Sequence, residues 1–231
     1  MKYPSTCPLC GAPRVGETLY ACVASASPCS PSEIEAAVLV ANRTAEASTA
    51  FLGALPPLYR GYAKRELAPE VLEINPELVV KLGRMSDHGF LYLCGDADAA
   101  KTHIAIRHAL QFAQRGLSVL FVEETSYFAA LLGEFGGGRP APDLLAPDVL
   151  IYDDLGKRKP SAFGLERLYD LLNTRLAQRK ALIITSNFTP GDVVLRMTDD
   201  PIVADALLSR LTSGQLAGVR RGKGGRKGIA I

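Results

Sequence analysis

The chain has 231 residues, of which 48% are hydrophobic, and its 26 Lys and Arg against 24 Asp and Glu leave a net charge of +2. This length predicts one main globular domain with a small appendage. No apolar run approaches the roughly 20 residues that a membrane helix needs, and none follows the first charged residues as in a secretory signal. We therefore expect a soluble cytoplasmic protein without membrane contact.

The start of the chain is rich in cysteine and contains Cys7, Cys10, Cys22 and Cys29. The first pair is followed by Gly11 and resembles a zinc knuckle, in which a tight turn presents two thiolates to one tetrahedral ion. The second pair is spaced more widely than usual. In a reducing compartment clustered cysteines favour metal over disulfides, so residues 1–31 are predicted to be a zinc-binding module. The alternative is a disordered arm with free thiols.

A helical connector is predicted next, over residues 32–54. The alanine-rich run from Ser32 to about Phe51 favours a helix with Ser32 as its N-cap and glutamates in its first turn. The double proline Pro56–Pro57 should halt this helix. It marks the predicted start of the main domain at Leu55.

A phosphate-binding loop is predicted within Phe90–Thr102, where an apolar run of strand type breaks into small residues. Gly95, Lys101 and Thr102 have the spacing of Gly-x-x-x-x-Gly-Lys-Ser/Thr. In that pattern backbone N–H groups wrap a polyphosphate, the lysine reaches its outer phosphates and the hydroxyl ligates magnesium. Ala100 stands where the second glycine belongs. The alternative is a chance turn with a surface lysine.

The residues after this loop, from about His103 to Arg115, have the apolar period of a helix. Its N-terminus adds a positive dipole end to the phosphate site. We expect ATP to contact the whole loop and the first residue of this helix, which are Gly95, Asp96, Ala97, Asp98, Ala99, Ala100, Lys101, Thr102 and His103.

Four further apolar runs of strand length predict a parallel sheet buried on both faces, namely Leu117–Val122, Val149–Asp154, Ala181–Thr185 and Leu216–Val219. Helical patterns alternate with them, in Ser126–Phe135, from Ser161 to about Arg179, after Thr189, and in Pro201–Leu211. Alternation of this kind, with a phosphate loop after the first strand, specifies a three-layer α/β NTPase over residues 55–220.

Polar side chains follow two of the predicted strands. Asp153 and Asp154 end one of them, and paired acids there are costly unless they meet a cation or face a site. We expect Asp153 to hold magnesium together with Thr102, and Asp154 to orient or deprotonate the attacking water. Asn187, after the next strand, can polarise that water or sense the outer phosphate. Plain turns are the alternative for both sites.

The end of the chain is locally basic, because five cations lie in the last dozen residues: Arg220, Arg221, Lys223, Arg226 and Lys227. Without these five charges the formal net charge of +2 becomes −3, so the basicity is local. Residues 221–231 are predicted to be either a nucleic-acid-binding tail or a solvated end.

These pieces together resemble the DnaC/IstB group of AAA+ ATPases, which comprises helicase loaders and transposition helper ATPases. The matching segments are Leu55–Arg60, Gly95–His103, Val149–Gly156, Ile183–Asn187 and Leu208–Gly214. The resemblance implies that Asp153 and Asp154 are the Walker B acids and Asn187 is sensor 1. It also implies that Arg210 is an arginine finger reaching the ATP of a neighbouring copy, and hence that the chain self-associates.

The cysteine-rich start further resembles the DnaI type of loader, in which a zinc-bearing domain binds the replicative helicase. The implied function is ATP-dependent loading of a DnaB-type helicase onto single-stranded DNA, with ATP, Mg²⁺ and Zn²⁺ as cofactors. Two alternatives stay open, a transposition helper that binds duplex DNA and a transposase, and an inactive adaptor. Asp98 and Ala100 replace glycines of the family loop, and Asp154 stands where many AAA+ proteins have Glu, so we expect weakened hydrolysis.

Overall fold

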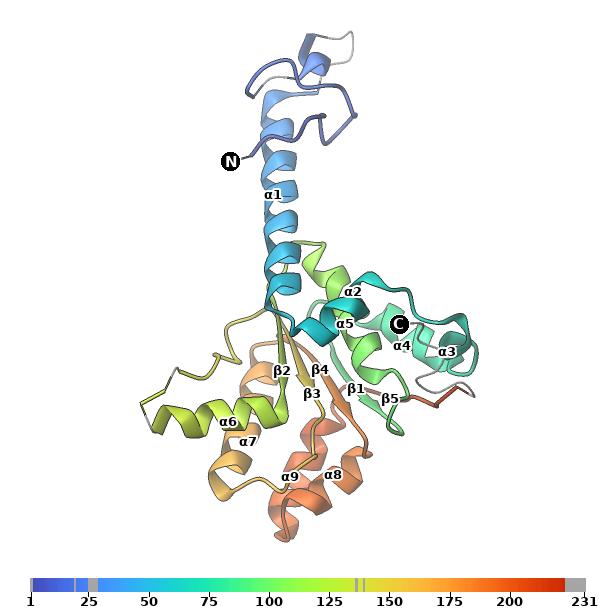
Figure 1. The fold of residues 1–231 in the computed structure, drawn as a ribbon, viewed down its shortest axis with the longest axis vertical. Helices are drawn as coiled ribbons and strands as arrows, with labels where there is room; N and C mark the ends of the chain where they lie inside the picture. Colours follow the sequence, from blue (N-terminus) through green and yellow to red (C-terminus); the bar gives the residue numbers. More distant parts are fainter. Residues whose placement is uncertain (1, 19, 25–28, 136, 139, 223–231) are drawn as a thin grey trace.

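The computed structural model describes residues 2–18, 20–24, 29–135, 137–138 and 140–222. A long helix, α1 (Pro31–Ala54), projects from an α/β domain and carries the cysteine-rich segment at its far end (Figure 1). Most of the predicted basic tail, with Lys223, Arg226 and Lys227, lies outside the described residues. Among the described helices, none has the length and apolarity needed to cross a membrane.

The α/β domain is built on one parallel sheet in the order β2-β3-β4-β1-β5. Its strands are β1 (Phe90–Cys94), β2 (Val119–Glu123), β3 (Val149–Asp153), β4 (Ala181–Ser186) and β5 (Gln215–Gly218). Because all five are parallel, their carboxyl ends meet at one edge, where ligands of such sheets bind. This arrangement confirms the predicted three-layer α/β fold with a P-loop.

Helices cover both faces of the sheet (Figure 1). One face packs on the end of α1 and on α2 (Pro57–Lys64), α4 (Pro76–Arg84) and α5 (Lys101–Ala113). The other packs on α7 (Ala162–Ala177), α8 (Pro190–Met197), α9 (Pro201–Leu211) and the adjoining α6 (Glu124–Phe135). Alternate residues of β1 serve the two cores, Leu91 and Leu93 on one side and Tyr92 on the other.

The N-cap of α1 is Ser30 and not Ser32 as predicted. Ser30 Oγ accepts from Glu33 N (3.3 Å), and Glu33 Oε2 accepts from Ser30 N (3.2 Å), which completes a capping box. Pro31 fits the first helical position because it lacks the N–H that would be unpaired there. The helix also runs three residues past the predicted end at Phe51, to Ala54.

The segment before β1 holds three helices that the sequence reading missed, α2, α3 (Pro69–Glu73) and α4. Each has proline in its first turn, Pro57, Pro69 and Pro76 respectively. Proline ends a helix at its interior but starts one readily. The double proline follows the end of α1, as predicted, and Pro57 also starts α2.

A third, small core lies at the far end of α1. We call described residues 2–24 together with Cys29 the cysteine module. Its buried residues pack on the first half of α1, and the cluster comprises Cys7, Tyr20, Cys22, Ile34 and Val38. Two isolated bridges and one 3-10 turn, Ala21–Ala24, are its regular structure in the described residues.

Candidate functional site

The phosphate loop between β1 and α5 has a backbone that suits glycine at several positions. Gly95 has φ +150°, and a Cβ there would lie 2.1 Å from Val219 O, so no side chain fits. Asp98 and Ala100 have φ +64° and +65°, in the left-handed region. An alanine in that region costs roughly 1–2 kcal/mol. The loop thus keeps the shape that the family glycines allow, with strain at Ala100.

Lys101, the first residue of α5, lies inside this loop and is only 6% exposed. Its Nζ donates to Gly95 O (2.9 Å), Asp96 O (2.7 Å) and Asn187 Oδ1 (2.8 Å). Burial lowers the pKa of Lys101, against the attraction of Asp154. The structure therefore brings the predicted lysine and the predicted sensor amide into direct contact.

Asp153, at the end of β3, is fully buried beside the loop. Its Oδ1 accepts from Thr102 Oγ1 (2.8 Å) and Thr185 Oγ1 (2.6 Å), whereas its Oδ2 is buried with no hydrogen-bond partner among the described residues. Burial raises the pKa of Asp153 to about 6, and Asp154 adds to the rise. An unpaired carboxylate oxygen next to a threonine hydroxyl is the donor set that magnesium takes. These residues fit the ion.

A third carboxylate, which the sequence analysis missed, lies beside Asp153 and Asp154. Glu123 ends β2, and carboxylate oxygens of the three acids lie within 4.8 Å of one another. Glu123 Oε1 accepts from Tyr59 OH (2.6 Å), which fastens α2 to this edge. Its signal in the sequence was the one used for Asp153, an acid directly after a buried apolar run.

Asp154 leaves β3 in a left-handed conformation with φ +62°. Its N–H donates to Thr185 Oγ1 (3.0 Å), and its Oδ2 forms an ion pair with Lys157 Nζ (2.6 Å). Thr185 therefore orients both acids from the neighbouring strand. The sequence reading predicted neither Thr185 nor Lys157 at the site.

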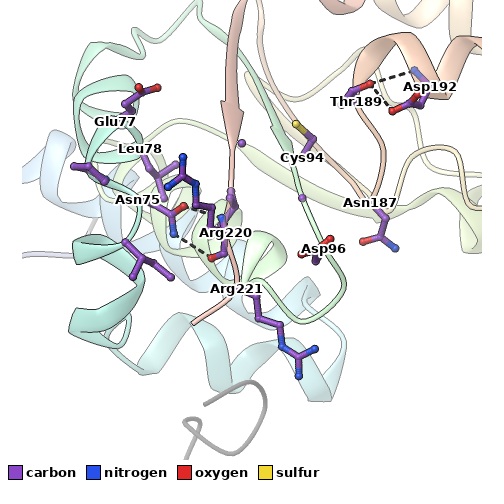
Figure 2. A pocket seen from close by; sticks show the side chains of 15 residues that line it. Asn75, Glu77, Leu78, Cys94, Asp96, Asn187, Thr189, Asp192, Arg220 and Arg221 are labelled. Carbon is purple, nitrogen blue, oxygen red and sulfur yellow. Dashed lines mark hydrogen bonds between the residues drawn. The ribbon is translucent and has the colours of Figure 1, made fainter. Parts of the chain in front are cut away.

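Two cavities flank the loop. One, of about 350 Å³, is lined by loop residues together with Glu123, Asp154 and Lys157, and beside it Tyr62 stacks on His103 with ring centroids 4.9 Å apart. The other, of about 700 Å³, lies on the side of β5 and shares Asn187 with the first. Figure 2 shows Asp96 and Asn187 on one side of it and the Asn75 contact to Arg220 on the other.

Arg210 near the end of α9 lies apart from both cavities. Its guanidinium packs over the ring of Tyr169 at 4.3 Å from the centroid and donates to Tyr169 OH (2.7 Å) and to Asn173 Oδ1. Both partners belong to α7. The structure therefore does not bring Arg210 to the phosphate loop of its own chain.

The four N-terminal cysteines converge on one point, with their sulfur atoms within 4.8 Å of one another. Four thiolates around a tetrahedral zinc, each at about 2.3 Å, lie about 3.8 Å apart. The turn after Cys7 is closed by Gly11 N donating to Cys7 O (2.9 Å), and Gly11 has φ +78°, which favours glycine. The thiol cluster has the donor set and the compactness of a structural zinc site.

Comparison with known proteins gives one sequence relative and several folds. An ATP-binding protein from an insertion sequence of Mycobacterium tuberculosis is 33% identical over 129 residues, which are 54% of this chain and 51% of that protein. The chain thus spans about half the length of the curated relative that it matches. Residues 80–217 of this chain match the family described as IstB-like ATP binding protein.

Among solved structures, the DnaC helicase loader aligns with a TM-score of 0.54 at 18% identity, over 78% of this chain and 99% of that chain. DnaI aligns with a TM-score of 0.51 at 18% identity, over 75% of this chain and 89% of that chain. AMPPCP-bound DnaA from Aquifex aeolicus aligns with a TM-score of 0.58 at 19% identity, over 76% of this chain and 54% of that chain. These likenesses establish the AAA+ fold, and with the family match over residues 80–217 they show that this chain belongs to the IstB-like ATP-binding family of the IstB/DnaC group.

Proposed function

We propose that this protein is an ATP-dependent loader of a DnaB-type replicative helicase onto single-stranded DNA, acting in the cytoplasm. The observation that carries the proposal is the thiol cluster, because a compact four-cysteine module at the far end of α1 stands away from the nucleotide site (Figure 1). Such a module can bind a partner while the α/β domain binds ATP. The likeness of the fold to that of the DnaC helicase loader and of DnaI supports the loader role.

We propose four domains, in keeping with these separate roles of the module and the α/β domain. Residues 1–31 form the zinc-binding module, 32–54 the connector, 55–220 the AAA+ domain and 221–231 the basic tail. The connector is a single helix whose two ends pack in different cores, Ile34 and Val38 in one and Phe51 in another. We expect α1 to transmit helicase docking to the nucleotide site through this one rigid element.

ATP would lie along residues 95–103, with its outer phosphates drawing Lys101 from the carbonyl oxygens that it now contacts. Thr102 and Asp153 would hold Mg²⁺, which neutralises charge on the phosphates. Asp154 would orient the attacking water. Asn187, already bonded to Lys101, would report on the γ-phosphate.

We further propose that the protein self-associates through Arg210. Since it packs on α7 away from its own cavity, we propose that it supplies charge to the ATP of a neighbouring copy, an effect worth on the order of 10³ or more in rate. Arg210→Ala should then abolish turnover and spare ATP binding. Mixing Arg210→Ala with Asp154→Asn protein should restore part of the turnover, and no restoration would place Arg210 outside a shared site.

A second candidate function is that of a transposition helper ATPase, which would bind duplex DNA and a transposase. The specific observation in its favour is the 33% identical relative from an insertion sequence. The thiol module lies outside the segment that matches the family, so the family match does not decide between the two.

The experiment is co-sedimentation with a purified DnaB-type helicase or with a transposase, in the presence of ATP. We expect helicase capture by wild type and by Lys101→Ala, and loss of capture by Cys7→Ser/Cys10→Ser. Capture of the transposase instead would favour the helper. Parallel titration with a fluorescent ATP analogue tests the adaptor alternative, because wild type that binds no better than Lys101→Ala has no working phosphate loop.

A further inference from the structure

A basic surface lies directly beside the site's carboxylates. The loop after β3 carries three consecutive exposed cations, Lys157, Arg158 and Lys159. Exposed Arg196 of α8 adds a fourth, because its Nε donates to Gly156 O (3.4 Å) at the base of this loop. We call these four cations the basic loop surface. Clustered exposed cations bind nucleic-acid phosphates without reading sequence.

The backbone beneath the basic loop surface is held rigidly. Glu124, which is 2% exposed, accepts from Gly156 N (3.1 Å) and Lys157 N (3.2 Å). Gly156 has φ +85°, and a Cβ there would lie 3.0 Å from Val193 Cγ2. We therefore assign the response of this loop to a ligand to its side chains.

Lys157 links the basic loop surface to the chemistry. Its Nζ lies 2.6 Å from Asp154 Oδ2, with the two side chains 53% and 23% exposed, and it also lines the phosphate cavity. Ion pairs at a solvent edge contribute at most ~1 kcal/mol. A nucleic-acid phosphate, which gains further from counterion release, can therefore compete with Asp154 for this ammonium.

Lys159 provides the contrast within the same loop. It pairs with Asp199 at 2.9 Å, with 61% and 89% of the two side chains exposed, and it does not line the phosphate cavity. The loop thus holds one cation coupled to Asp154 and one cation of the same type that is not. This pair makes a matched comparison possible.

We propose that the basic loop surface binds the backbone phosphates of single-stranded DNA, and that Lys157 exchanges between Asp154 and a DNA phosphate. Without DNA, Lys157 holds the carboxylate of Asp154. When DNA takes Lys157, that carboxylate is free to act on water. The binding half stands on the charges alone, and the regulatory half rests on the hydrolysis proposed above.

A double-mutant cycle on DNA binding tests the exchange without hydrolysis. The probe is a fluorescein-labelled oligo(dT), followed by anisotropy. Asp154→Asn removes the competing carboxylate, and asparagine tolerates φ +62°, so DNA affinity should rise about two- to fivefold at low salt. Lys157→Ala should abolish that rise and reduce the slope of log K against log salt by about 0.7.

The control is the same double-mutant cycle carried out with Lys159→Ala in place of Lys157→Ala. Lys159→Ala should also lower DNA affinity, but additively with Asp154→Asn, because Lys159 does not contact that acid. An Asp154→Asn gain that persists in Lys157→Ala overturns the exchange, and unchanged affinity in both lysine variants overturns the surface. Tighter binding of a duplex of equal length would assign the surface to duplex DNA and overturn the single-strand assignment.

Turnover with and without oligo(dT) tests the regulatory half. Lys157→Ala should raise DNA-free turnover and lose stimulation by DNA, while Lys159→Ala leaves DNA-free turnover unchanged. If Lys157→Ala lowers DNA-free turnover and is still stimulated by DNA, then Lys157 does not restrain Asp154. Absence of turnover in every protein, with the binding cycle as expected, would overturn the proposed ATPase and leave the phosphate exchange in place.

Discussion

The cysteine module and the α/β domain hold their folds by different means. The module shares a core of five buried residues with α1, two of them cysteines, whereas the domain buries both faces of a five-stranded sheet. A buried large apolar side chain contributes about 1.5–3 kcal/mol. The few such side chains in the module contribute too little in total to offset the loss of chain entropy on folding. We therefore expect the module to need a bound metal to fold, whereas the domain depends on apolar burial.

Removing zinc should give the largest effect, and it should act on the module alone. Structural zinc contributes roughly 10–16 kcal/mol in small modules, so chelation should unfold residues 2–24 and leave the sheet intact. Elemental analysis should find one zinc per chain, and hydrogen exchange should show lost protection only in the module. Cys94→Ser, which changes a buried cysteine outside the cluster, should keep the metal. A metal-free protein with a protected module contradicts the idea.

A buried cation also organises the α/β domain, at Arg175 of α7. This residue is 0% exposed, and burial lowers its pKa to about 10. Its guanidinium donates to four carbonyl oxygens, those of Leu144, Pro147, Asp148 and Ala181, at 2.6–3.1 Å. This guanidinium gathers carbonyl oxygens from the loop before β3 and from β4 around one charge, as a zinc ion would gather thiolates in the module.

Arg175→Met should therefore lower the free energy of unfolding of the domain by about 3 kcal/mol or more, because buried carbonyls lose their donors. Denaturant unfolding measures this change. Exposed Arg167 on the same helix supplies the control, and Arg167→Met should change stability by less than about 0.5 kcal/mol. Equal effects of the two variants would show that the burial of Arg175 carries no special stabilisation.

Asp153 should show that the nucleotide site weakens the domain. Its pKa is raised to about 6 from 3.8, so the folded state favours the protonated acid. The stability that this protonated form contributes is fully present below pH 4 and is lost as pH rises through 6. Asp153→Asn should then add about 2–3 kcal/mol at pH 8 without added magnesium. The gain should shrink at pH 5, and exposed Asp170→Asn should give none. A gain that does not vary with pH contradicts the charge as its cause.

Ala100 should give the smallest effect. Ala100→Gly removes the left-handed strain at φ +65°, which should stabilise the domain by about 1 kcal/mol or less and tighten binding of a fluorescent ATP analogue. Ala99→Gly is the control, since that residue does not share the positive φ and its glycine should destabilise. Weaker ATP binding by Ala100→Gly would mean that the methyl group does not hinder the loop.

Much of the α/β domain was predictable from the sequence because its signals are local. Buried parallel strands appear as continuous apolar runs, and the phosphate loop is a contiguous pattern of small residues before Lys101 and Thr102. The α5 and α9 helices follow from period and punctuation. The helices α2, α3 and α4 were missed because proline both ends and starts helices, and the residues around each proline decide which.

Which distant side chains meet depends on the tertiary structure. The contact of Lys101 with Asn187 spans 86 residues and that of Thr102 with Asp153 spans 51, and both exist because the strand order places β4 between β3 and β1. Strand order depends on how helices pack over the sheet, and no local pattern records it. The phosphate loop and the two acids after β3 were predictable as contiguous local patterns, whereas the approach of Glu123 to these acids and of Lys157 to Asp154 depends on how the chain folds.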